Sequence, residues 1–170
     1  MIFTPLTSGK SVEGNEIEAF KTDTEAPKYI YLMAGTHGDE VEGVYVLQEL
    51  FKWLKEEHAL EDLPIVVLPI LNPDGYRASS RVNSHAVDLN RNYPTENWCA
   101  EFKKDKNNPG PKGLSEPENI FLEKLFEKFP PGFIISFHSW KPILNFNDDA
   151  QDIAEYLSSY NEYPVAGDIG

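Results

Sequence analysis

Apolar and polar positions follow two different periods in the first half of the chain. Residues 29–34 form a short, continuous apolar run, which predicts a buried strand. Residues 41–57 then repeat apolar side chains at the spacing of an amphipathic helix. A second apolar run at 63–70 has prolines near both ends and predicts another buried strand. Strand, helix and strand together predict a βαβ unit with parallel pairing.

The second half of the chain predicts another strand and two helices after a long irregular segment. Residues 115–129 fit a helix with a capping box, in which Ser115 is the N-cap and Glu118 the third helical residue. Residues 133–137 predict a third buried strand and 153–160 a short helix, while 17–20 fits a short strand after a turn at 12–15. Residues 71–114 show no sustained period and begin with the turn sequence Asn72-Pro-Asp-Gly. A loop of this length indicates a functional segment.

Composition narrows the class of protein. The length of 170 residues predicts one domain over 1–170. A net charge of −13 argues against general binding to nucleic acid or to anionic membranes. A single cysteine, Cys99, excludes an intrachain disulfide and fits a reducing compartment. The chain shows neither a signal peptide nor an apolar run of the ~20 residues that span a bilayer, so we predict a cytoplasmic protein.

Two strand ends carry the side chains of a metal site. His37 and Glu40 follow the strand at 29–34, where open α/β sheets bind ligands. Alone, this pair is better explained as an acidic helix N-terminus, in which Asp39 and Glu40 complement the helix dipole. His138 follows the strand at 133–137, and a parallel sheet brings both imidazoles to one edge. His37, Glu40 and His138 would then be the three protein ligands of a catalytic zinc ion. His58, in a charged helix end, and His85, in a polar loop, are weaker candidates.

The loop adds polar groups suited to a peptide substrate. Asn90 and Arg91 could grip a carboxylate, and Arg81 could stabilise an oxyanion. Asp88 could hold the free nitrogen of a zinc-bound histidine. Taken singly, each of these residues is better explained as part of a solvated loop.

In chain order, the motifs Gly-Thr-His37-Gly-Asp-Glu40, Arg81-Val-Asn, Val-Asp-Leu-Asn90-Arg91-Asn-Tyr-Pro and Phe-His138-Ser resemble those of the zinc metallocarboxypeptidases (funnelins). The loop is most similar to that of bacterial murein tripeptide carboxypeptidases, which remove diaminopimelate from γ-D-glutamyl-diaminopimelate peptides. The resemblance implies one zinc ion on His37, Glu40 and His138, and an activated water that hydrolyses a C-terminal amide bond. It implies that Asn90 and Arg91 bind the substrate's terminal carboxylate and that Arg81, rather than Arg77, stabilises the oxyanion.

The same resemblance implies an α/β three-layer sandwich with a mixed, largely parallel, twisted sheet of eight strands, of the phosphorylase/hydrolase-like type. The family's general base is a glutamate that follows a tyrosine-bearing loop far along the chain. This sequence ends at Gly170 before that region, and neither Glu155 nor Glu162 lies in the matching motif. We therefore expect that the C-terminal part of the domain is missing and that the 170-residue chain is impaired relative to a longer one.

Three other functions remain open at this point. An N-acyl amino acid hydrolase of the aspartoacylase or succinylglutamate desuccinylase type shares the His-x-x-Glu and Asp-Leu-Asn-Arg elements, although the long loop and Tyr93-Pro94 favour a peptidase. A non-catalytic module would bind peptide C-termini without cutting them. An ordinary α/β scaffold would bind no stoichiometric zinc.

Overall fold

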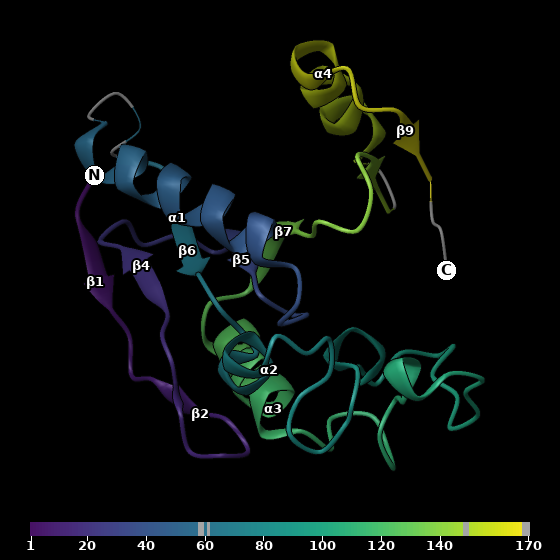
Figure 1. Cartoon of the computed structure of the whole chain (residues 1–170). Helices are drawn as coiled ribbons and strands as arrows, with labels where there is room; N and C mark the ends of the chain where they lie inside the picture. The colour runs from purple at the N-terminus through teal and green to yellow at the C-terminus, as the bar shows by residue number, and fades with distance from the viewer. Residues whose placement is uncertain (58–59, 61, 148–149, 168–170) are drawn as a thin grey trace. The chain divides into compact units, whose positions relative to one another are not determined.

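The computed structural model describes residues 1–57, 60, 62–147 and 150–167. The chain divides into two compact units, Met1–His138 and Ser139–Gly170, and each is described by itself. Figure 1 follows the chain through both units. The prediction of a single domain over 1–170 stays a prediction. None of the helices in the described residues is long and apolar enough to cross a membrane.

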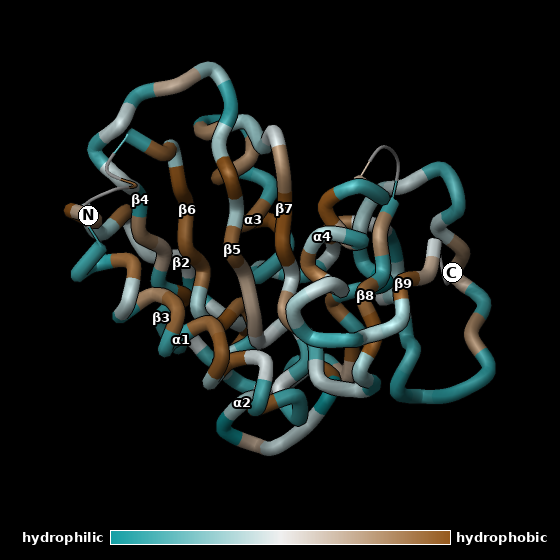
Figure 2. The backbone as a smooth tube through the Cα atoms, turned by 90° about the horizontal axis from the view of Figure 1, so that it is seen from above, coloured by the Kyte–Doolittle hydropathy of each residue, from teal (hydrophilic) through white to brown (hydrophobic). Residues whose placement is uncertain are grey.

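The first unit contains a mixed five-stranded sheet in the order β1-β4-β6-β5-β7, whose last four strands lie side by side in Figure 2. Its elements, in chain order, are β1 (Phe3–Pro5), β2 (Gly9–Lys10), β3 (Glu16–Ile17), β4 (Phe20–Thr22), β5 (Tyr29–Ala34), α1 (Val41–Glu56), β6 (Ile65–Leu68), α2 (Pro73–Ala78), α3 (Pro117–Lys128) and β7 (Pro131–Phe137). Strand β5 pairs in parallel with β6 and β7, whereas β4 pairs antiparallel with β6 and β1. The predicted βαβ unit is therefore confirmed, and so is the α/β class with a mixed sheet.

Helices cover both faces of this sheet. Tyr31 and Met33 of β5 pack in one core cluster with Leu122 of α3. The alternate residues, Leu32 and Ala34, pack in a second cluster with helix α1. Because successive side chains of a strand point to opposite faces, α1 and α3 lie on opposite sides of the sheet. This arrangement accounts for the continuous apolar run of β5, which is buried on both faces.

The second unit is small. It contains β8 (Leu144–Asn145), helix α4 (Gln151–Asn161) and β9 (Val165–Ala166), with β8 and β9 paired in parallel. The helix expected at 153–160 is confirmed and is slightly longer than predicted.

Several predicted boundaries were wrong. The strand expected at 63–70 forms only at Ile65–Leu68, between its two prolines. The segment 17–20 belongs to two strands, β3 and β4, rather than to one. The predicted capping box does not form, because Glu116 is the N-cap of α3 and the Ser115 hydroxyl bonds to the Glu116 carboxylate.

The long loop also contains more regular structure than its pattern indicates. Asn72-Pro-Asp-Gly begins helix α2, and the Asn72 side chain caps it by accepting the Gly75 N–H at 2.9 Å. Two short 3-10 helices follow, Leu89–Arg91 and Asp105–Asn107. Much of the remaining segment, teal in Figure 1, is irregular.

Asp74 joins helix α2 to the turn between β2 and β3. Its buried carboxylate accepts hydrogen bonds from Ser11 Oγ at 2.6 Å, Asn15 Nδ2 at 2.7 Å and the Glu13 N–H at 3.0 Å. Burial alone would raise the pKa of Asp74, but these hydrogen bonds outweigh it and lower the pKa below its usual value. The carboxylate therefore fixes the helix that lies next to the candidate site.

We expect Asp74→Ala to lower the free energy of unfolding by about 2–3 kcal/mol near neutral pH, because three donors lose their acceptor. Since the folded-state pKa is depressed, this contribution is fully present above the unfolded-state pKa and is lost as pH falls through the folded-state pKa. Urea unfolding of both proteins at several pH values between neutral and about pH 3 tests this, and the difference should shrink on acidification. A difference independent of pH would contradict it.

Candidate metal centre

The sheet brings the three predicted metal ligands together. His37 and Glu40 lie in the turn between β5 and α1, and His138 directly follows β7. These strands are parallel neighbours, with Ala34 opposite Phe137, so both turns leave the same edge of the sheet. Gly43 lets α1 approach β7, because a Cβ there would lie 2.9 Å from the Phe137 carbonyl oxygen. One ligand atom from each of His37, Glu40 and His138, which we call the metal group, lies within 4.8 Å of the other two.

The rings of both histidines present the same nitrogen to Glu40. His37 Nδ1 lies 2.9 Å from Glu40 Oε1, and His138 Nδ1 lies 2.7 Å from Oε2. Each Nε2 has a partner outside the group, Asp88 Oδ1 at 3.1 Å for His37 and Ser136 Oγ at 3.1 Å for His138. An Nε2–H donated to Asp88 leaves the Nδ1 lone pair of His37 facing Glu40. Two imidazole nitrogens and a carboxylate, converging in this way, fit the ligand set of a zinc ion.

Burial and hydrogen bonding act against each other at this group. Only 3% of His37 and 7% of Glu40 are exposed. Burial favours the neutral carboxyl, but hydrogen bonds from His138 and His37 prevail and hold the pKa of Glu40 far below its usual range. Burial likewise opposes charge on His37, yet its bonds to Asp88 and Glu40 raise the pKa of this imidazole. The site therefore favours an ionised carboxylate facing the two imidazoles.

Arg81 reaches the metal group, whereas Arg77 does not. Arg81 Nη1 lies 3.2 Å from His37 Nδ1 and 3.5 Å from Glu40 Oε1, and its Nη2 donates to Asp88 Oδ2 at 2.9 Å. Arg77 instead donates to Asn15 Oδ1 in the turn between β2 and β3. Arg81 and not Arg77 therefore lies beside the predicted ligands, and its role in stabilising an oxyanion stays a prediction. The guanidinium beside the ligand atoms could stabilise a negative charge that develops there.

Asn90 and Arg91 lie on the adjoining 3-10 helix and are exposed. The Asp88 side chain caps this helix, since its Oδ1 accepts the Asn90 N–H at 3.0 Å. Asp88 thereby contacts His37, Arg81 and the Asn90–Arg91 turn together. Its predicted contact with a ligand histidine is present, and it also organises the neighbouring turn.

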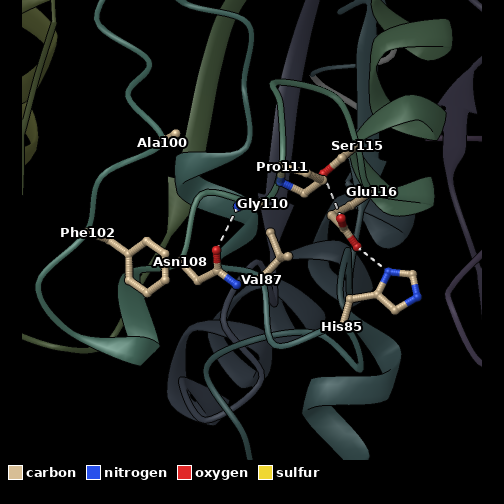
Figure 3. A pocket seen from close by; sticks show the side chains of 9 residues that line it. All are labelled: His85, Val87, Ala100, Phe102, Asn108, Gly110, Pro111, Ser115 and Glu116. Atoms are coloured by element: carbon tan, nitrogen blue, oxygen red, sulfur yellow. Dashed lines mark hydrogen bonds and ion pairs between the residues drawn. The ribbon is translucent and has the colours of Figure 1, made fainter.

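The other two histidines do not join this group. His85 Nδ1 lies 2.8 Å from Glu116 Oε2, at a cavity of about 700 Å³ lined also by Phe102 and Asn108 (Figure 3). His58 lies outside the described residues. Sequence reasoning missed Ser136. It lies two residues before His138, and alternate residues of a strand point to the same face, so the spacing could have indicated this contact.

We expect Asp88→Asn to weaken zinc binding about 10- to 100-fold, because the amide cannot provide the same charged partner for His37 Nε2–H. Competition with a chromogenic chelator measures the dissociation constant. Asp105→Asn is the matched control, since Asp105 is an exposed aspartate at the start of the other 3-10 helix. Equal zinc affinity in wild type and Asp88→Asn would show that Asp88 does not support the ligand.

Comparison with known proteins points to one family. The family model for zinc carboxypeptidases matches residues 2–164. The chain is 32% identical to murein peptide amidase A of Vibrio campbellii, over 99% of this chain and 70% of that protein. Its structure resembles the crystal structure of murein-tripeptide amidase from Escherichia coli O157 with a TM-score of 0.75 and 30% identity, over 95% of this chain and 71% of that one.

A more distant likeness shows the fold alone. An aspartoacylase family protein from Mesorhizobium loti aligns with a TM-score of 0.61 and 19% identity, over 95% of this chain and 49% of that one. The match of the zinc carboxypeptidase model to nearly the whole chain, supported by relatives at 30% identity or above, is decisive. The chain belongs to the zinc carboxypeptidase family and is a metallocarboxypeptidase by descent.

Proposed function

We propose that this protein is a zinc-dependent carboxypeptidase that hydrolyses the C-terminal amide bond of a small murein-derived peptide, γ-D-glutamyl-diaminopimelate. The convergence of His37, Glu40 and His138 within 4.8 Å carries the proposal. The similarity to murein peptide amidase A supports the choice of substrate. These three side chains would hold one zinc ion, which supplies Lewis-acid polarisation of the scissile carbonyl and a more acidic water.

The chain's own residues would bind and orient the peptide. Asn90 and Arg91 would hold the terminal carboxylate, because a guanidinium binds a carboxylate with two parallel hydrogen bonds. Arg81 would donate to the carbonyl oxygen as negative charge develops on it. Its guanidinium is held by Asp88 and lies next to His37, so no large rearrangement of the side chain is needed.

Release of diaminopimelate tests this function against its rivals. The zinc-loaded protein is incubated with γ-D-glutamyl-diaminopimelate and, separately, with N-acetyl-aspartate and N-succinyl-glutamate. Diaminopimelate release that is lost on chelation supports the proposal, whereas release of acetate or succinate favours the N-acyl amino acid hydrolase. Binding of the peptide with no product over long incubation favours a non-catalytic module, and the absence of stoichiometric zinc favours a scaffold.

Arg91→Lys distinguishes recognition of the terminal carboxylate from a general charge effect. Lysine keeps the charge but loses the paired donors, so we expect kcat/KM for the free peptide to fall about 10- to 100-fold. The same peptide with its C-terminal carboxylate amidated should be cleaved equally poorly by both proteins. An unchanged kcat/KM in Arg91→Lys would remove Arg91 from the proposed binding role.

A further inference from the structure

Positive charge is concentrated in one segment of this acidic chain. The whole chain has 15 Lys and Arg against 28 Asp and Glu, yet residues 77–112 hold seven basic and four acidic residues. All three arginines lie in this segment, together with four of the lysines. We define the lysine loop as residues 103–112, which carry Lys103, Lys104, Lys106 and Lys112 with a single acidic residue.

The lysine loop is fixed to the candidate site by its backbone. Arg81 Nε donates to the Lys106 carbonyl at 3.2 Å, and the Asp88 N–H donates to the Asn108 carbonyl at 2.8 Å. Asn92, next to Arg91, donates through Nδ2 to the Pro109 carbonyl at 2.7 Å and to the Lys112 carbonyl at 3.0 Å. The loop is therefore held beside both the metal group and the Asn90–Arg91 turn.

The lysine side chains remain available to a ligand. All four are exposed, and in the described part of the chain none has an ion pair with an acidic residue. Asn108, Gly110 and Pro111 of the lysine loop line the cavity of Figure 3, but its lysines do not. Four unpaired cations beside an anion-binding turn would attract a ligand with more than one carboxylate.

We propose that Lys103, Lys104 and Lys106 form a specificity surface for a second carboxylate of the peptide, separate from the terminal one at Asn90 and Arg91. This inference rests on the proposed function and names the substrates that the site prefers, namely peptides with an additional carboxylate near the scissile bond. Because these lysines are exposed, their effect is largest at low ionic strength and is screened by salt.

Calorimetric titration of two matched peptides onto the metal-free protein tests the proposal without turnover. The peptides are γ-D-glutamyl-diaminopimelate with the glutamyl α-carboxylate either free or amidated. At low ionic strength we expect the wild type to bind the free form about five- to tenfold more tightly. Lys103→Gln/Lys104→Gln/Lys106→Gln should reduce this preference to about onefold to twofold, and added salt should do the same to the wild type.

A control variant separates a local effect from a change in total charge. Lys28→Gln/Lys124→Gln/Lys128→Gln removes the same charge from exposed lysines elsewhere and should keep the preference. The inference is overturned if the lysine-loop variant keeps the preference, if the control loses it, or if the wild type binds both peptides equally. Binding of neither peptide to the wild type would also overturn the inference, whereas the proposed function is tested separately by the zinc-dependent release of diaminopimelate.

Discussion

We expect His138→Ala to abolish stoichiometric zinc binding at micromolar metal and to reduce peptide hydrolysis to background. A catalytic zinc ion needs three protein ligands, and His138, which directly follows strand β7, is the predicted ligand that lies far along the chain from the other two. Loss of a residue that only hydrogen-bonds to a metal ligand weakens metal binding by up to about 100-fold. Loss of a ligand itself should therefore weaken zinc binding by more than about 100-fold. Metal analysis after dialysis, together with competition against a chelator, measures both stoichiometry and affinity.

His85→Ala is the matched control for this experiment. It removes an imidazole that also faces a carboxylate, that of Glu116, but lies outside the metal group. We expect one zinc ion per chain in this variant, as in the wild type. If His138→Ala kept one tightly bound zinc ion with an unchanged far-UV spectrum, His138 could not be a ligand and the proposed site would be wrong.

The sequence predicted the parts of this fold that depend on strong periodicity. The strand at 29–34 and the helix from residue 41 have the predicted bounds to within a residue, because both bury wide apolar surfaces against a neighbour. The meeting of His37, Glu40 and His138 followed from two parallel strands ending at the same edge. Their roles as zinc ligands stay a prediction until metal binding is measured.

Local signals failed where tertiary contacts decided the outcome. Ser115 has the sequence of an N-cap, but its hydroxyl donates to Glu116 and accepts a hydrogen bond from Asn92, so α3 begins later. Asn72-Pro-Asp-Gly reads as a turn, but Asp74 binds the turn after β2 and Asn72 caps the backbone, and together they stabilise a short helix. Such contacts join residues far apart in the chain, so no local pattern reveals them.

We expect Gly38→Ala to displace the turn that carries His37 and Glu40 and to lower the free energy of unfolding by about 3 kcal/mol, at the upper end of overpacking costs. A Cβ at Gly38 would lie 2.0 Å from the Gly75 carbonyl carbon and 2.2 Å from the Tyr76 nitrogen. Both atoms belong to the backbone of α2, which Asn72 and Asp74 hold in place, so the neighbour cannot yield by a side-chain rotation. Since Gly38 directly follows His37, the displaced turn should also bind zinc much more weakly.

Urea unfolding and zinc competition on the same samples separate these two effects. Gly167→Ala is the control, because a Cβ at that position would make only an ordinary contact, 3.8 Å from Phe146. It should change neither stability nor zinc affinity appreciably. Lower stability with unchanged zinc affinity in Gly38→Ala would mean that α2 supports the fold without setting the geometry of the ligands. Unchanged stability would mean that the close approach of the turn to α2 is not a feature of the folded protein.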